Sequence, residues 1–493
     1  LTDVTGVQTC ALPICREGGK ASEVSFEFGY RLAVNELRAA IGRHGADSVA
    51  VFISPECSNE EMFLANQIAR EGLKTNNIGS LSLLQAATPS GVLDKSFGFT
   101  GSTATRHALD DADLIICNNT DTLNDAMVLN VSILGAVKER GAKLIVSNST
   151  GDPMSELDNL TLDPMRGRAS VLWNGVIRAL LDSDRITREA VAAIPGGSDV
   201  LADLDGMTVT RASDLSGVEG DKIRQAAELV AQAKKIVIIH SPDRIQDSAP
   251  GDLTSLANLL IIARSAGIGC ELLLPTISAN SAAVELMGAD PVFDTAKLPA
   301  DAALPGAHSR EELRAKLESG EIKAAIVIGE DPFCNDRTAS WFRNCEFLVA
   351  LDWAATETTQ FADIAFPMTT YLEASGTRVS FEGVMRDFDQ ALEPPSGMPG
   401  WRVLSELANK LGVDVPACCS EDIGYLWLER VRRAPHGEMI YSWLLGSPTP
   451  VTEMTLRVPE VTLKPGRIPS PVTVMEKYKR TMREVGLEHF RVR

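Results

Sequence analysis

The chain lacks the features that would tie it to nucleic acid or to the interior of a membrane. Lys and Arg total 47 of 493 residues against 66 Asp and Glu, which gives a formal net charge of −19. This excess of negative charge repels a phosphate backbone, so nucleic acid is not expected as a partner. A run of about 18 apolar residues is also absent. The most apolar stretch, residues 256–275, contains both an arginine and a glutamate. Direct membrane insertion is therefore not expected.

Recognisable catalytic and metal-binding motifs are missing as well. The nine cysteines form no Cys-x-x-Cys pair, and the six histidines are just as scattered. An odd number of cysteines in a long chain argues against a disulfide framework and for a reducing compartment. Neither a Gly-x-Gly-x-x-Gly fingerprint nor a P-loop occurs, which disfavours a Rossmann-type NAD site. We therefore predict no catalytic residue and no metal ligand.

The first residues are expected to lie outside the folded domains. The chain starts with Leu1 rather than Met, and residues 7–14 (VQTCALPI) resemble translated sequencing-adapter sequence. Residues 1–19 are accordingly predicted to be a non-native or disordered leader. The alternative is a short native N-terminal arm.

From residue 24 onward, short apolar runs alternate with amphipathic helical patterns. The clearest unit is an apolar run at 113–117, a helical pattern at 126–140 and a second apolar run at 143–146. Two apolar runs that bracket an amphipathic helix indicate parallel strands joined by a right-handed crossover. Similar runs occur at 48–53, 235–239, 324–328, 347–351 and 363–366. The pattern predicts an α/β protein whose binding sites lie at the carboxyl ends of parallel strands.

One candidate site follows the predicted strand 113–117, at Asn118, Asn119 and Thr120. Backbone N–H groups at the start of the next helix, together with these side chains, could hold a phosphate or the edge of a pterin. The same residue types also cap helices and close turns. The lack of a glycine fingerprint favours capping, but the residues alone leave both interpretations open.

A second candidate site follows two later strands. Gly329, Glu330 and Asp331 come directly after the run 324–328, and Asp352 ends the run 347–351. Glycine allows close backbone approach, and the carboxylates could accept hydrogen bonds from a guanine or a ribose. Alternatively, an Asp-Pro turn fixes the exit of the first strand, and Asp352 caps the helix predicted at 356–361.

Several segments, taken in order, resemble the molybdopterin oxidoreductase family. The strongest is 347–412, in which a strand, a Thr-Glu-Thr helix and an Ala-Asp strand precede Glu-x-x-Gly-Thr at 373–377; the others are 51–79, 111–121, 141–149 and 320–332. The resemblance implies an α/β fold with two interleaved doubly wound parallel-sheet domains. Their expected bounds are 20–90 with 315–412 for the first domain and 91–314 for the second, and residues 413–493 form a C-terminal extension.

The resemblance also implies a role in electron transfer. Within the family, the chain is most similar to the large iron–sulfur subunit of NADH-quinone oxidoreductase (respiratory complex I), a complex that passes electrons from NADH to quinone. The alternative is the catalytic alpha subunit of a formate dehydrogenase. Both begin with cysteine-rich cluster domains, so we expect an N-terminally truncated fragment whose iron–sulfur clusters lie in the missing part. The implied partners are other subunits of a respiratory complex, including an NADH-oxidising subunit, and the implied location is cytoplasmic and peripheral to the inner membrane.

The cofactor implied by the resemblance is molybdopterin guanine dinucleotide, held by Asn118, Asn119, Thr120, Gly329, Glu330, Asp331 and Asp352. The chain departs from the family pattern at two phosphate-binding positions. It has Cys-Asn-Asn-Thr at 117–120 where catalytic members have Gly-x-Asn-Pro, and Ser-Asn-Ser at 147–149 where they have Asp-Pro-Arg. Loss of the glycine and the arginine removes close backbone approach and a bidentate phosphate partner. We therefore expect a scaffold that has lost the cofactor, with a stand-alone guanine-nucleotide-binding module as a further hypothesis.

Overall fold

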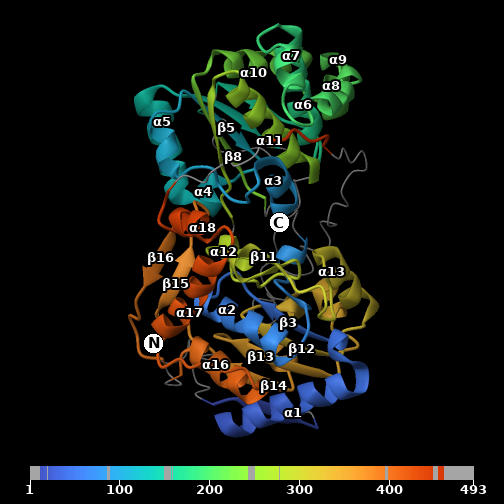
Figure 1. Ribbon diagram of the computed structural model, residues 1–493, viewed down its shortest axis with the longest axis vertical. Coiled ribbons are helices and arrows are strands. Elements are labelled where there is room, and N and C mark those ends of the chain that lie inside the picture. Colours follow the sequence, from blue (N-terminus) through green and yellow to red (C-terminus); the bar gives the residue numbers. More distant parts are fainter. Residues whose placement is uncertain are drawn as a thin grey trace, which may run out of the picture.

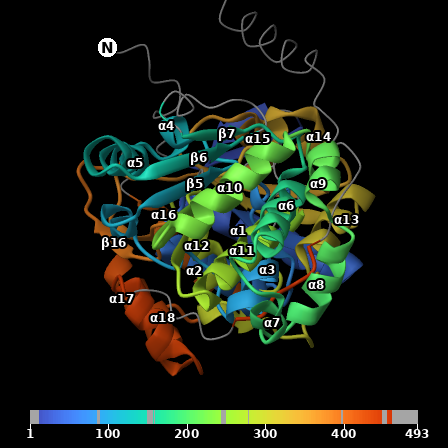
Figure 2. The same cartoon turned by 90° about the horizontal axis from the view of Figure 1, so that it is seen from above.

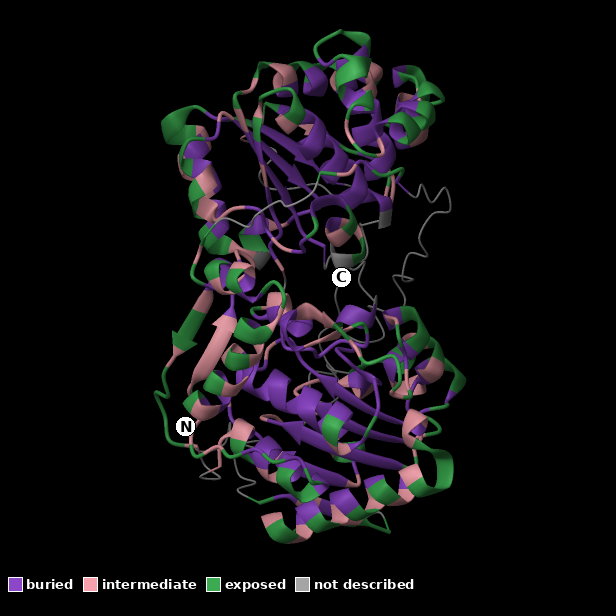
Figure 3. Ribbon diagram, in the orientation of Figure 1, coloured by how far each residue is buried: buried purple, intermediate pink, exposed green. Residues whose placement is uncertain are grey.

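The computed structural model describes residues 12–18, 20–85, 89–148, 157, 159–242, 250–276, 278–394, 398–447 and 454–459. These residues form two lobes stacked along the long axis, each built around one sheet (Figure 1). Both sheets are buried, and the outward sides of the surrounding helices are exposed (Figure 3).

The first lobe contains a seven-stranded sheet of order β2-β1-β14-β13-β12-β3-β4. The strands from β14 to β4 are parallel, and β1 pairs antiparallel with both β14 and β2. The strands are β1 (Ile14–Glu17), β2 (Lys20–Glu23), β3 (Val49–Ile53), β4 (Ile78–Gly79), β12 (Ala324–Ile328), β13 (Phe347–Asp352) and β14 (Ile364–Pro367).

Strand β1 corrects the prediction for the first residues. Residues 1–19 were expected to be a non-native or disordered leader, but Ile14 and Cys15 pair with β14. The Cys15 side chain is only 3% exposed and belongs to the core of the first lobe. For residues 14–17 the expectation of disorder is therefore wrong, because four residues lack the length to show strand periodicity. Residues 1–11 and residue 19 lie outside the described residues.

Helices cover both faces of the first sheet. Successive apolar side chains of β3, β12 and β13 point to opposite faces of the sheet. On one face they pack against α1, α2 and α16, and on the other they pack against α13 and the residues around Trp341. The helices of this lobe are α1 (Phe26–His44), α2 (Asn59–Gln67), α12 (Ser281–Leu286), α13 (Arg310–Ser319), α14 (Asp336–Ser340), α15 (Glu357–Phe361), α16 (Gly400–Leu411), α17 (Ser420–Arg433) and α18 (Gly437–Leu444).

The second lobe contains a five-stranded, fully parallel sheet of order β7-β6-β5-β8-β9. Its strands are β5 (Leu114–Asn118), β6 (Lys143–Ser147), β7 (Leu160–Leu162), β8 (Lys235–His240) and β9 (Gly269–Leu273). The unit predicted at 113–146 is confirmed as β5, α5 and β6, with β5 and β6 parallel and in register.

Helices also lie on both faces of the second sheet. Figure 2 shows α10, α6 and α11 on one side of β5 and β6, and α5 on the other, in agreement with the two apolar clusters. The helices of this lobe are α3 (Pro89–Phe97), α4 (Thr122–Asp125), α5 (Met127–Arg140), α6 (Ala169–Asp182), α7 (Arg188–Ala192), α8 (Gly197–Asp205), α9 (Val209–Ser216), α10 (Gly220–Gln232) and α11 (Pro250–Ser265). The predicted α/β architecture with two doubly wound sheets is thus confirmed.

Two short hairpins and the C-terminal helices complete the molecule. Strands β15 (Gly376–Val379) and β16 (Met385–Phe388) form one hairpin, and β10 (Phe293–Asp294) and β11 (Leu298–Pro299) form the other. Helices α17 and α18 pack on the first lobe through Trp427 and Trp443, both at most 2% exposed. The described part of the expected C-terminal extension, up to residue 447, therefore contributes to this core.

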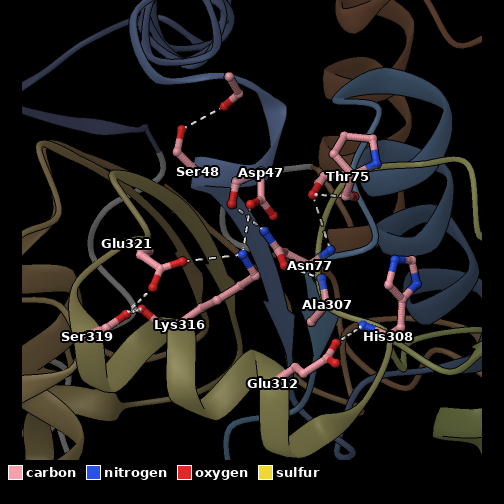
Figure 4. A network of polar contacts seen from close by, with 12 residues as sticks. Asp47, Ser48, Thr75, Asn77, Ala307, His308, Glu312, Lys316, Ser319 and Glu321 are labelled. Atoms are coloured by element: carbon pink, nitrogen blue, oxygen red, sulfur yellow. Dashed lines mark hydrogen bonds and ion pairs between the residues drawn. The ribbon is translucent and has the colours of Figure 1, made fainter.

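A polar network fastens the connection before α13 to the edge of the first sheet (Figure 4). The Asn77 side chain donates to the Asp47 carbonyl at 2.8 Å and accepts from the Ala307 N–H at 2.8 Å. Lys316 on α13 forms an ion pair with Asp47 at 2.7 Å and one with Glu321 at 3.4 Å. These bonds hold 305–316 close to β4.

Candidate functional site

The carboxyl ends of β12 and β13 carry four of the predicted site residues. The two strands are adjacent and parallel, so Gly329 and Asp352 end neighbouring strands, as predicted. Gly329 adopts φ = +63°, and a Cβ there would lie 3.0 Å from the Trp353 ring and 3.2 Å from Cys57 Sγ. Glycine is thus required for the turn, but protein atoms already fill the space beside it.

The half-buried carboxylate of Glu330 lies against the segment that follows β4. It accepts hydrogen bonds from the Ser80 hydroxyl at 2.7 Å and the Leu81 N–H at 2.8 Å, and a longer one from the Ser82 N–H at 3.4 Å. Burial raises the pKa of Glu330 to about 7, although these hydrogen bonds act in the opposite direction. Glu330 therefore links the end of β12 to the segment that follows β4.

Asp331 and Asp352 make similar local contacts around α15. Asp331 accepts from the N–H of Thr358 at 2.9 Å and from its hydroxyl at 2.6 Å. Asp352 accepts from the Ala354 N–H at 3.1 Å and the Thr356 hydroxyl at 3.3 Å, and burial raises its pKa to about 6. Of the two interpretations that the sequence left open, these contacts match the one in which the carboxylates order the turn and the following helix.

At the carboxyl end of β5, Asn118 points into the second lobe. Its side-chain oxygen accepts from Trp173 Nε1 at 2.7 Å, and its amide nitrogen lies 3.0 Å from His240 Nδ1 on β8. Asn118 is fully buried, and burial lowers the pKa of His240 to about 4, so the imidazole is neutral at pH 7. Asn118 is thus part of a structural network in the second lobe.

Asn119 and Thr120 form the turn after β5. Asn119 has φ = +52°, and its N–H donates to the Ser147 carbonyl at 3.0 Å. Asn148 accepts from the Thr120 N–H at 3.1 Å and donates to its carbonyl at 2.8 Å. The hydroxyls of Thr120 and Ser147 are buried and have no hydrogen-bond partner among the described residues. Buried hydroxyls without partners are uncommon and fit a polar ligand at this edge.

These contacts test whether the predicted residues fit a pterin dinucleotide. In the first lobe Glu330, Asp331 and Asp352 already accept hydrogen bonds from neighbouring donors, which leaves fewer acceptor sites for a ligand, although Asp331 accepts both of its bonds at Oδ1. In the second lobe, two hydroxyls remain available. The seven predicted residues are therefore divided between two sheets, and among the described residues buried hydroxyls without a hydrogen-bond partner lie at the strand ends of the second lobe.

A small cavity lies between the lobes, and we call it the interlobe cavity. Pro242 and Leu274, which follow β8 and β9, line it together with Leu83, which follows β4. The carboxyl ends of both sheets thus face this region, as the parallel topology predicts. The cavity measures about 70 Å³. That volume is far below the ~300–1,000 Å³ of a typical ligand pocket.

Buried charges line the interlobe cavity, and no pattern in the sequence indicated them. Glu285 lies 3.3 Å from Lys297 and 3.2 Å from Arg310, and Arg310 also pairs with Asp290 at 2.5 Å. Lys297 has φ = +56°, an unfavourable conformation for a residue with a side chain. The charges are balanced within the cluster, which gives it no evident preference for an anion.

A larger cavity, the Arg378 cavity, lies at the carboxyl ends of β3, β13 and β14 and measures about 220 Å³. The hairpin β15–β16 closes it with Arg378 and Phe388. Its other lining residues are Glu56, Cys57, Ser58, Glu61, Trp353, Met368, Thr369, Thr370, Tyr371 and Ala374. Sequence reasoning missed this cavity, because no motif relates residues more than 300 positions apart.

Thiols and acidic side chains do not gather into a metal site in the part of the chain that the structure describes. No group of three or more His, Cys, Asp or Glu side chains there could hold a metal ion. Cys57 and Cys270 are buried, and burial raises the pKa of both thiols. No described helix has the length and hydrophobicity needed to cross a membrane.

Comparison with known proteins agrees with the family resemblance seen in the sequence. A family model described as molybdopterin oxidoreductase matches residues 11–410. The chain is 26% identical over 413 residues to the NADPH-Fe(3+) oxidoreductase subunit alpha of Geobacter sulfurreducens, covering 80% of this chain and 48% of that protein. It is 25% identical over 427 residues to the F420-dependent formate dehydrogenase 1 subunit alpha of Methanococcus maripaludis, covering 81% and 62%. The chain spans about half the length of the curated relatives it matches.

Among solved structures, the fold is similar to that of acetylene hydratase from Pelobacter acetylenicus. The TM-score is 0.68 at 17% sequence identity, and the match covers 92% of this chain and 67% of the other. At this identity the likeness concerns the fold alone.

Proposed function

Because the chain belongs to the molybdopterin oxidoreductase family, we propose that it is a subunit of an electron-transfer complex in which the family fold serves as a scaffold. The functional analogue that we propose is the large iron–sulfur subunit of NADH-quinone oxidoreductase. In this proposal electrons pass from an NADH-oxidising subunit toward quinone, through iron–sulfur clusters outside the described residues. The complex is peripheral to the inner membrane on its cytoplasmic side, and this chain meets other subunits rather than lipid.

One observation carries the scaffold proposal. The carboxylates that would hold a guanine dinucleotide in the first lobe are bound to their own loop and helix, as Asp331 is to Thr358. A ligand would have to share these carboxylates with charge-assisted hydrogen bonds that are already formed, each of which contributes roughly 1.5–3 kcal/mol. The names of the relatives, which are alpha subunits, support the presence of partner subunits.

Metal and pterin analysis of the intact native protein tests this proposal. We expect molybdenum, tungsten and pterin well below one equivalent per chain. An enzyme known to contain molybdopterin, purified in parallel, is a positive control for recovery of the cofactor. Stoichiometric metal with pterin in the chain would overturn the scaffold proposal.

A second candidate function is that of a catalytic subunit similar to formate dehydrogenase. The unpartnered hydroxyls of Thr120 and Ser147 favour it, because they leave donors for a polar ligand at the second sheet. When bound, molybdopterin would supply a redox-active metal centre. The residues of this chain would then only bind and orient the ligand, through Thr120 and Ser147. Formate-dependent reduction of a viologen dye by the intact native protein, reduced by Thr120→Val, would support this candidate, and no reduction above a formate-free blank would eliminate it.

A further inference from the structure

The Arg378 cavity contains an arginine side chain with a hydrogen-bond donor that is not used by the described residues. The Arg378 guanidinium lies over the Phe388 ring at 5.2 Å and the Tyr371 ring at 5.9 Å, and Nη2 donates to the Glu56 carbonyl at 2.6 Å. Its Nε is buried and has no hydrogen-bond partner among the described residues. Among the described residues no carboxylate lies within ion-pair distance of Arg378, although its positive charge acts to lower the pKa of Glu61 in the same lining. A buried N–H donor of this kind is costly unless something accepts from it.

A second donor in the cavity is the hydroxyl of Thr369. Its oxygen accepts from the Gly400 N–H at 3.1 Å, and its own proton has no acceptor among the described residues. A hydroxyl can donate one hydrogen bond while it accepts another, so Thr369 can still donate. The cavity therefore offers donors to an occupant that supplies acceptor atoms.

The two carboxyl groups in the lining limit the charge of that occupant. Glu56 accepts from the Ala279 N–H at 3.3 Å, and Glu61 accepts from the Ser58 N–H at 2.9 Å. Burial raises the pKa of Glu61 to about 7, so near neutral pH this group is partly uncharged. A single negative charge beside Arg378 is compatible with these neighbours, whereas the double charge of a phosphate would be repelled more strongly.

The walls of the cavity limit the rest of the occupant. Trp353, Met368, Tyr371 and Phe388 give the cavity apolar and aromatic sides. A volume of about 220 Å³ is several times that of one water molecule, ~30 Å³. It is also smaller than the ~300 Å³ at which pockets for larger ligands begin. A single ring with one charged group matches these dimensions.

We propose that the Arg378 cavity is a binding site for a small monocarboxylate with an apolar or aromatic body. The carboxylate accepts hydrogen bonds from Arg378 Nε and the Thr369 hydroxyl, and the ring packs between Trp353 and Phe388. This site lies in the first lobe beside β3 and β14 and does not depend on the scaffold function proposed above.

Calorimetric titration of the full chain with benzoate tests the site, with benzamide as a neutral probe of the same shape. We expect saturable binding of benzoate and at least about tenfold weaker binding of benzamide, the loss expected for one charge-assisted hydrogen bond. Arg378→Met should weaken benzoate binding by a similar factor or more, and Thr369→Val by a smaller factor. The matched control is Arg432→Met. Arg432 lies on α17, its guanidinium packs 4.8 Å from the centre of the Tyr441 ring on α18, and its replacement should leave benzoate binding unchanged.

Several results of these titrations would overturn the proposal. Equal binding of benzoate to the wild type and to a folded Arg378→Met variant would overturn the proposal, as would the absence of saturable binding. If Arg378→Met does not fold, Thr369→Val and the benzoate-to-benzamide ratio decide the matter. Inorganic phosphate and GMP form separate arms, and binding of either without binding of benzoate would also overturn the proposal.

Discussion

Thr377 on β15 donates two hydrogen bonds to the carboxylate of Glu60 on α2, from its N–H at 2.9 Å and from its hydroxyl at 2.6 Å. Trp427 on α17 donates a third, from Nε1 at 3.5 Å. Glu60 is 1% exposed, and burial raises its pKa while the bonds from Thr377 act to lower it. One carboxylate thus connects α2, the hairpin that carries Arg378, and the C-terminal helices.

This relationship predicts that the hydroxyl of Thr377 is needed for stability. Thr377→Val keeps the side-chain shape but removes the shortest donor to a buried carboxylate, and we expect the free energy of unfolding to fall by about 1–3 kcal/mol. Thr377→Ser keeps the hydroxyl and should cost less. Urea unfolding of both variants checks this, and equal loss in the two would show that the hydroxyl bond contributes nothing.

Local patterns in the sequence were enough to predict most of the two sheets. The strands β5, β6, β8, β12 and β13 all occur where short apolar runs predicted them, because a strand buried on both faces is apolar at nearly every position. Strand β1 was missed, since it is short and is defined by pairing with β14 at the far end of the chain.

The candidate site was predicted less well than the fold. Sequence position placed Asp331 and Asp352 correctly at the ends of adjacent strands, but it could not show that Thr358 and Thr356 donate hydrogen bonds to their carboxylates. The Arg378 cavity depends on contacts between α2, three strand ends and a hairpin. Such contacts over long sequence separations leave no periodic pattern in a single sequence.

The contacts of Arg70 predict that replacing this buried arginine lowers the free energy of unfolding much more than replacing an exposed arginine. All its donor nitrogens are used, with bonds from Nε to Asn76 at 3.0 Å and from Nη1 to the Gly288 carbonyl at 2.6 Å among them. Arg70→Met would leave several buried acceptors unsatisfied and should cost more than about 3 kcal/mol. Arg43, 49% exposed and paired with Glu346 at 3.1 Å, is the matched control, and Arg43→Met should cost less than about 1 kcal/mol. Similar melting temperatures for the two variants would contradict this prediction.

Gly383 predicts a steric requirement at the tip of the hairpin β15–β16. It has φ = +85°, and a Cβ there would overlap the indole ring of Trp443. Gly383→Ala therefore combines left-handed strain with displacement of a buried indole, and we expect a loss of about 3 kcal/mol or more. Gly412 has φ = +97° with nothing within 4 Å of its Cβ position, so Gly412→Ala should show the strain alone, about 1–2 kcal/mol. The prediction fails if thermal denaturation gives equal losses.

Glu330 predicts a stability that depends on pH in a defined direction. Burial raises its pKa from 4.5 to about 7 in the folded protein. An acid with a raised folded pKa stabilises the protein fully below its unfolded pKa, and this contribution is lost as the pH rises through the folded value. Between pH 5 and pH 8, the wild type should therefore lose stability relative to Glu330→Gln, by up to about 3 kcal/mol. Glu61, whose pKa is also raised to about 7, is present in both proteins, so its effect cancels in the difference.

Urea unfolding at several pH values measures this difference directly. Asp422→Asn serves as the control, because hydrogen bonds from the Cys418 and Cys419 N–H groups lower the pKa of that carboxylate and keep it ionised throughout the window. Its offset from the wild type should therefore stay constant from pH 5 to pH 8. A constant offset for Glu330→Gln as well would mean that Glu330 is ionised at pH 5 in the folded protein. The bonds from Ser80 and Leu81 would then outweigh the cost of burying its charge, the opposite of the balance inferred here.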